Sequence, residues 1–219
     1  MASQLLPTNT FDELHERLGL VPLNRILINP PPGTATEEHV LEERDGPNKR
    51  LVELIDGVLV EKAVGTPESF LGGRLFRIIA DYADEYELGV VLPGDGPLRL
   101  APGNVRYPDV SFIPWEALPG GELPTEKIWD VTPALAVEVL SESNTPAEMG
   151  RKLDDLFAAG CKLVWFIDPP TKTAKVYTSA KRFKELDATG TLDGGKVLPG
   201  FTLPLADLFA ATKRKKKPR

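Results

Sequence analysis

A strand, a helix and a second strand follow one another in the second half of the sequence, and this succession limits the folds open to the chain. Residues 134–140 form an apolar run interrupted only by Glu138, which is typical of a central strand covered on both faces. The Thr, Pro and Glu within residues 145–148 are a helix start signal, and Gly160 ends that helix. A second strand is expected over residues 162–167, which are apolar after Lys162. Since such crossovers are almost always right-handed, we expect two parallel neighbouring strands.

Apolar patterning adds further elements around this unit. Two apolar runs flank Asp56-Gly57 and predict a hairpin over residues 51–62. Helices are expected at 10–18, 36–44 and 67–87, and strands at 89–92, 97–100, 105–113 and 174–178. Turns are expected between 178 and 205, followed by a short amphipathic segment at 205–209. A hairpin combined with a parallel pair predicts an α/β fold with a central mixed β-sheet flanked by helices. We expect an N-terminal arm with short helices (1–50), one domain (51–209) and a basic disordered tail (210–219).

The charge of the chain is unevenly distributed. The formal net charge is −6, but residues 213–219 hold six of the 26 cations, so the other 212 residues carry 20 positive and 32 negative charges. The net charge therefore conceals a strongly acidic body and a basic C-terminal segment, which can have different binding partners. The basic tail is interpreted either as an anchor for nucleic acid or as a solubilising run of terminal charge.

Other parts of the composition restrict the chemistry and the compartment. The single cysteine, Cys161, excludes an internal disulfide and a cysteine-based zinc site, and its apolar neighbours favour a small buried residue. The chain has only two histidines, His15 and His39, so a catalytic pair of histidine with serine or cysteine is unfavoured. Any catalysis must therefore depend on carboxylates and lysines. No apolar run is long enough to span a membrane and no signal peptide is apparent, so we expect a cytoplasmic protein.

Glu138 is the most informative residue in the sequence. A carboxylate in the middle of an apolar central strand costs several kcal/mol unless it is paired or bound to a metal. The simpler alternatives are a strand-end residue facing solvent and a buried glutamate paired with an arginine.

Asp109 and Lys152 are the two other candidates. Pro108 cannot donate to a strand ladder, so Asp109 lies at an edge or irregularity where its side chain can be re-aimed, although Pro-Asp also commonly marks a turn. Lys152 lies two turns into the capped helix and beside its apolar stripe, so it can reach back toward Glu138. An exposed pair with Glu148, four residues earlier, is the alternative.

Two carboxylates and a lysine at one sheet edge suit metal-assisted phosphodiester hydrolysis. Carboxylate oxygens hold Mg²⁺ while water and phosphate oxygens complete its coordination. The metal acidifies the attacking water, and a lysine ammonium stabilises the charge that develops on the phosphate.

At these residues the sequence resembles the Uma-two family of endonucleases, within the restriction-endonuclease-like PD-(D/E)xK superfamily. The matching motifs are Pro108-Asp109, Glu138 to Ser141, Lys152, residues 160–169, the hairpin Leu51 to Glu61 and the closing segment Leu198 to Phe209. The resemblance covers about residues 51–209 and implies a restriction-endonuclease-like fold. It also implies a Mg²⁺-dependent enzyme, with Mn²⁺ as a substitute, that hydrolyses DNA.

By the same resemblance, Asp109 and Glu138 bind the metal and Lys152 is the catalytic lysine. The superfamily pattern places the lysine two residues after the glutamate, where this chain has Leu140, so the lysine is displaced onto the following helix. Glu68 is either an extra metal ligand or an acid favoured by the first turn of its helix. Glu53 and Glu61 are weaker candidates, because exposed strand faces carry such residues routinely.

The acidic body is poorly suited to binding DNA unaided. Bound Mg²⁺, the basic tail and a local basic patch could offset the charge, or DNA could bind in the groove of a homodimer. The patch comprises Lys172, Lys175, Lys181, Arg182 and Lys184. The rival hypothesis is a binding or assembly module that kept the nuclease fold and lost the chemistry. A glycosidase is a more distant alternative.

Overall fold

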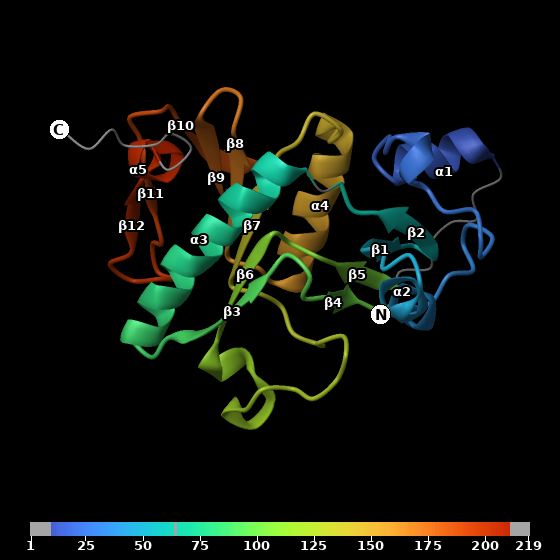
Figure 1. Cartoon of the computed structure of the whole chain (residues 1–219), viewed down its shortest axis with the longest axis horizontal. Helices are drawn as coiled ribbons and strands as arrows, with labels where there is room; N and C mark the ends of the chain where they lie inside the picture. The colour runs from blue at the N-terminus through green and yellow to red at the C-terminus, as the bar shows by residue number, and fades with distance from the viewer. Residues whose placement is uncertain (1–9, 64, 211–219) are drawn as a thin grey trace.

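A six-stranded sheet forms the centre of the computed structural model, which describes residues 10–63 and 65–210 (Figure 1). Its strand order is β10-β9-β8-β7-β6-β3. The strands are β3 (Gly89–Pro93), β6 (Val110–Pro114), β7 (Leu135–Val139), β8 (Leu163–Asp168), β9 (Thr173–Ser179) and β10 (Arg182–Leu186). Strands β7 and β8 are parallel, and the other neighbouring pairs of this sheet are antiparallel. The mixed sheet and its strand–helix–strand unit are therefore confirmed.

Helices cover both faces of the central sheet. Helices α3 (Thr66–Glu85) and α5 (Leu205–Ala210) pack on one face, and α4 (Pro146–Ala159) packs on the other. The apolar residues of β7 at positions 135, 137 and 139 belong to the core beneath α3. Because side chains alternate along a strand, Glu138 points to the opposite face, toward α4.

Helix α4 begins and ends at the capping residues that its sequence predicts. The Thr145 hydroxyl accepts a hydrogen bond from the Glu148 N–H at 3.0 Å, and Gly160 ends the helix at φ 110°. A glycine adopts this left-handed conformation at little cost.

A second sheet, with the order β2-β1-β5-β4, lies beside the central one. Its strands are β1 (Val52–Ile55), β2 (Val58–Glu61), β4 (Leu98–Ala101) and β5 (Asn104–Arg106), and the predicted hairpin turns at Asp56-Gly57. The single strand expected over residues 105–113 is wrong, because β5 belongs to this sheet and β6 to the central one. The chain crosses between them at residues 107–109, where Pro108 has no N–H to continue a ladder.

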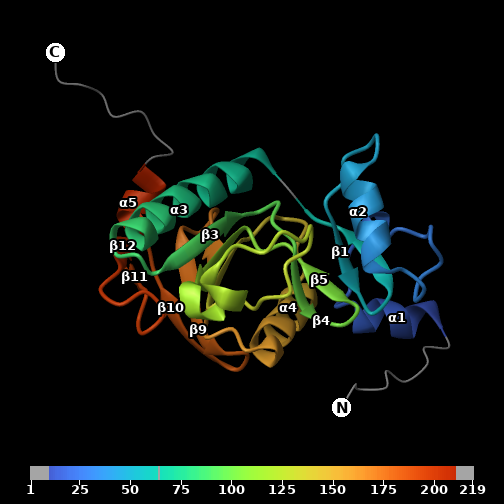
Figure 2. The same cartoon turned by 90° about the horizontal axis from the view of Figure 1, so that it is seen from below.

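The N-terminal segment packs on the rest of the chain. It contains α1 (Phe11–Arg17), the short 3₁₀ turn η1 (Leu23–Arg25) and α2 (Glu37–Asp45), and both predicted helices are confirmed. Arg25 donates two hydrogen bonds, of 2.8 and 3.1 Å, to the Glu148 carboxylate on α4. Figure 2 shows α1 and α2 beside the second sheet, at the end of the molecule away from α5.

The stretch between residues 178 and 205 contains more than the expected turns. Strand β10 extends the central sheet, while β11 (Thr191–Asp193) and β12 (Thr202–Pro204) form a two-stranded ribbon. The side chains of residues 182–185 are all exposed, so β10 lacks the alternation that reveals a strand. Two short 3₁₀ turns, η2 (Trp115–Ala117) and η3 (Pro119–Gly121), precede β7.

Two remaining predictions concern the membrane and the tail. Within residues 10–63 and 65–210, none of the helices has the length and apolar character needed to cross a bilayer. The basic tail at residues 213–219 lies outside the described residues.

Candidate active site

Asp109 lies at the crossing between the two sheets and is fixed from two sides. Its Oδ2 atom accepts a hydrogen bond of 2.7 Å from the N–H of Val139, the neighbour of Glu138 in β7. Its Oδ1 atom lies 2.8 Å from the ammonium of Lys62. The Asp109 side chain remains 21% exposed, so a small ligand can reach it.

Glu138 is buried between β7 and α4. Its Oε1 atom lies 2.9 Å from the ammonium of Lys152, so its partner is a lysine and neither solvent nor arginine. Burial disfavours the charged form and raises the pKa of Glu138 to about 7; Lys152 opposes this shift and the negative charge of Asp109 adds to it.

Lys152 joins two carboxylates in the interior. Its ammonium lies 2.9 Å from Glu138 and 3.0 Å from Glu53, and the residue is only 6% exposed. Burial acts against the charged form, but the two carboxylates outweigh it and hold the pKa of Lys152 above its usual range. The exposed pair with Glu148 is absent, because Glu148 binds Arg25.

Glu53 is buried, and its expected place on an exposed strand face is wrong. All four residues of β1 are buried, and Glu53 is 3% exposed. Its carboxylate contacts Lys152, lies 2.8 Å from Arg106 and accepts the Tyr107 N–H at 3.2 Å. Burial opposes its charge, but Lys152 and Arg106 outweigh burial and hold the pKa of Glu53 well below its usual range. Glu53 interrupts an apolar strand just as Glu138 does, and this signal could have identified it.

Lys62 is a site residue that sequence reasoning missed. It follows β2, and its ammonium contacts Asp109 and donates a hydrogen bond of 3.0 Å to the Gly94 carbonyl. Its side chain is nearly buried. No local pattern marks it, because its partners come from distant parts of the chain.

A network of ion pairs surrounds these residues. Arg106 contacts both Glu53 and Asp155, and Arg151 continues the chain of contacts from Asp155, at 3.0 Å, to Asp56, at 3.1 Å. Positive and negative groups alternate throughout the network. The interior charges are therefore compensated, which is the condition for burying them.

Glu68, the candidate accessory ligand, and Glu61, one of the weaker candidates, lie at the margin of the site. Glu68 is in the first turn of α3 and lines a cavity of about 260 Å³ that also contains Lys62 and Asp109. Glu61 is half-buried, and its backbone carbonyl accepts a hydrogen bond from Arg25. Within the part of the chain that the structure describes, no three Asp, Glu, His or Cys side chains are arranged to hold one ion.

The family model of Uma2, described as a putative restriction endonuclease, matches residues 37–206. The chain belongs to this family. The match begins in α2, so it includes part of the segment that we separated as an N-terminal arm. A comparison with curated proteins gives no match.

The backbone is similar to the crystal structure of a putative nuclease belonging to DUF820 from Anabaena variabilis ATCC 29413. The two chains are 18% identical and superpose with a TM-score of 0.66, over 74% of this chain and 91% of the other. This likeness confirms the restriction-endonuclease-like fold. The Uma2 match supports a nuclease-like function.

The Uma2 family belongs to a superfamily that generally depends on divalent metals, so the donor set is compared with that requirement. Asp109 and Glu138 supply hard carboxylate oxygens at one edge of the sheet, joined through the Val139 N–H. Mg²⁺ is commonly held by one or two carboxylates, with water and phosphate in the remaining positions. The two side chains therefore supply donors of the type that such an ion prefers, and each lies against a lysine ammonium.

Proposed function

We propose that this protein is a divalent-metal-dependent endonuclease that hydrolyses DNA phosphodiester bonds. The observation that carries the proposal is the contact of 2.9 Å between Lys152 and Glu138, beside the segment that holds Asp109. The lysine that the superfamily pattern places on the strand is missing at Leu140. Lys152 delivers the same ammonium to the same carboxylate from α4.

In this proposal, Asp109 and Glu138 hold a Mg²⁺ ion, for which Mn²⁺ can substitute. The ion supplies an activated water and neutralises charge on the phosphate. The Val139 N–H and Lys62 fix the orientation of Asp109, so the carboxylate does not need to reorganise when the substrate arrives. Glu68 borders the cavity next to Asp109 and is available as an accessory ligand through water.

Lys152 has the role of stabilising negative charge on the transferring phosphate. Its ammonium is already positioned by Glu53 and Glu138, and it is held in the charged form by them. A fixed positive group in a water-poor site stabilises developing charge more strongly than a solvated one.

The alternative is a module that retains the fold without catalysis. The complete pairing of Asp109 with Lys62 and of Glu138 with Lys152 favours it, because both carboxylates are compensated without a metal. A lysine far from both carboxylates would have been a stronger sign of lost function, and Lys152 is in contact with one of them.

The test is cleavage of supercoiled plasmid DNA with Mg²⁺, with Mn²⁺ and with EDTA. The wild type is expected to nick or linearise the plasmid only with metal, while Asp109→Asn and Lys152→Met lose at least 100-fold in rate. Exposed Lys127→Met is the matched control for Lys152 and should retain full rate. Linear product without a nicked precursor would indicate two sites acting together in a homodimer. Equal cleavage by Asp109→Asn and wild type would overturn the role of Asp109, whereas no cleavage by the wild type would favour the non-catalytic module.

A further inference from the structure

A run of positive charge lies on the edge of the central sheet, outside the candidate active site. Residues 169–184 contain five cations and no carboxylate, although the whole chain is acidic. We call residues 171–184 the basic ribbon; they comprise β9, most of β10 and the adjoining turns (Figure 1). Its cations are Lys172, Lys175, Lys181, Arg182 and Lys184.

The cations of the basic ribbon differ from those around the candidate site. Lys62, Arg106 and Lys152 are all paired with carboxylates. None of the five ribbon cations forms an ion pair with any residue in 10–63 or 65–210. Glu185 is opposite Lys175 in the strand register, but the two are not joined by an ion pair. The positive charge of the ribbon is therefore available to an external anion.

Strand register places the ribbon in line with the candidate site. Glu138 of β7 is the direct partner of Phe166 in β8, and Phe166 is the direct partner of Lys175 in β9. Paired residues lie on the same face of a sheet, so Lys175 and Glu138 share the face covered by α4. Two strand spacings separate them, which is about 10 Å. Lys175 is thus within a few nucleotides of a phosphate bound at Glu138.

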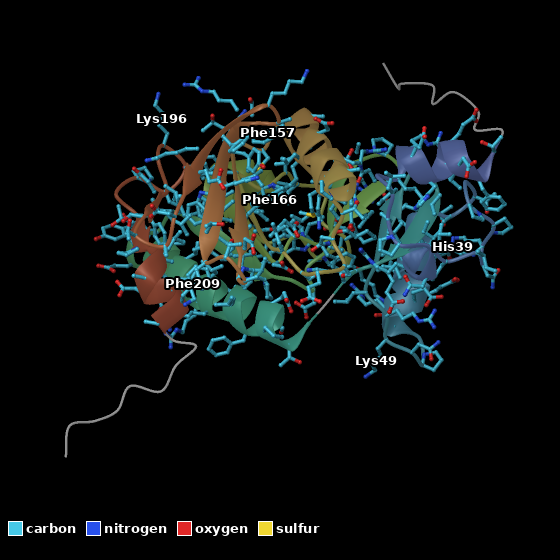
Figure 3. All side chains as sticks on the ribbon, turned by 90° about the horizontal axis from the view of Figure 1, so that it is seen from above. His39, Lys49, Phe157, Phe166, Lys196 and Phe209 are labelled. Atoms are coloured by element: carbon cyan, nitrogen blue, oxygen red, sulfur yellow. The ribbon has the colours of Figure 1, made fainter. Side chains whose placement is uncertain are left out.

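A cavity of about 500 Å³ occupies the space beside this row. It is lined by Ser141, Phe166, Lys175 and Tyr177, among others, and Figure 3 labels Phe166 between α4 and the ribbon. The Lys175 ammonium lies 5.3 Å from the ring centre of Phe183, which rests against Tyr177. This cation–π contact holds the ammonium at the ribbon surface, where Phe183 itself is 49% exposed.

We infer that the basic ribbon binds the phosphate backbone of DNA adjacent to the bond held at Asp109 and Glu138. This inference rests on the proposed nuclease function and adds the surface that retains the substrate. Unpaired cations with an exposed aromatic side chain are typical of nucleic-acid-binding surfaces. Glu142 and Asp168 border the same cavity, so the attraction is confined to the ribbon side.

Two variants of the full chain with equal loss of charge provide the test. Lys172→Gln/Lys175→Gln/Lys184→Gln removes three ribbon cations. Lys49→Gln/Lys162→Gln/Lys196→Gln removes three exposed lysines elsewhere that form no ion pair within the described residues. Figure 3 shows Lys49 and Lys196 at separate ends of the molecule. Binding of a labelled DNA duplex is measured by fluorescence anisotropy across a range of salt concentrations, and plasmid cleavage is measured in parallel.

The ribbon variant is expected to bind at least about tenfold more weakly at low salt and to lower the slope of log K against log salt by about 2 to 3. The control variant should change this slope by less than about 1. Equal weakening in both variants would overturn the inference, because only overall charge would then matter. Unchanged binding by the ribbon variant while the wild type cleaves DNA would overturn the inference alone. Absence of DNA binding and cleavage by the wild type would overturn both the inference and the proposed function.

Discussion

The ammonium of Lys62 lies 2.8 Å from the Asp109 carboxylate, so a lysine side chain already occupies the position beside a proposed metal ligand. A divalent ion bound to Asp109 would lie close to this ammonium, and two positive charges a few ångströms apart repel strongly in a half-buried setting. Under the proposed function, Lys62 therefore orients Asp109 but also lowers its affinity for a divalent ion.

Replacing Lys62 is expected to increase the affinity for metal. Lys62→Met should bind Mn²⁺ about tenfold or more tightly in isothermal titration calorimetry, since the repelling charge is gone. Lys62→Arg keeps the charge and should show no such gain. Weaker Mn²⁺ binding by Lys62→Met would mean that the orientation of Asp109 outweighs the repulsion, contrary to this prediction.

Glu138 is expected to make stability depend on pH. Its pKa is about 7 in the folded protein against a usual value of 4.5, so the folded state holds the proton more tightly than the unfolded chain. The resulting stabilisation is complete below about pH 4.5 and is lost as the pH rises through 7. Glu138→Gln does not titrate, so its free energy of unfolding should gain about 3 kcal/mol relative to wild type across this interval. Urea denaturation at several pH values measures the difference, and a difference independent of pH would contradict the prediction.

Arg106 is expected to be essential for stability. It is 1% exposed and compensates both Glu53 and Asp155, so Arg106→Met leaves buried carboxylates with fewer partners. Breaking such a pair from one side costs about 3–5 kcal/mol. Arg106→Lys keeps the charge but lacks the planar fork that reaches two carboxylates. Its free energy of unfolding should therefore lie between those of the wild type and Arg106→Met. A loss below about 1 kcal/mol in urea denaturation of Arg106→Met would contradict this role.

Alanine substitutions at two glycines with similar backbone conformations can distinguish the cost of backbone strain from the cost of a steric clash. Gly19 has φ +83° and Gly103 has φ +75°, so alanine is strained at both, by roughly 1 kcal/mol. A Cβ atom on Gly19 would lie 2.6 Å from the Glu148 Cα in α4, whereas one on Gly103 meets nothing within 4 Å. Gly19→Ala should therefore lower the melting temperature clearly more than Gly103→Ala. Equal shifts would show that the N-terminal segment does not press on α4.

The sequence predicts those parts of the fold whose signals are local. The apolar run around Glu138 and the capped helix that carries Lys152 are continuous patterns, and both elements form where expected. The edge strand β10 was not predicted, because residues 182–185 are all exposed and do not alternate between buried and exposed side chains.

The candidate site residues were predicted where a local pattern marks them. Glu138 interrupts an apolar strand, Asp109 follows a proline at a strand irregularity, and Lys152 lies on the capped helix that follows β7 and contacts Glu138. Glu53 breaks a pattern too, but the burial of its strand depends on other parts of the chain. The pairing of Lys62 with Asp109 depends on how two sheets meet, and no neighbouring residues encode it.

The buried ionic network has a consequence for how the protein is made and degraded. Its members Glu53, Arg106, Glu138 and Lys152 are distributed over the middle of the chain, and each needs partners from another element. A nascent chain therefore has no assembled site until α4 has been synthesised. A proteolytic fragment that lacks any one member leaves a buried charge unmatched, at a cost of about 3–5 kcal/mol. Assembly of the network thus links residues that are synthesised far apart, from Glu53 to Lys152.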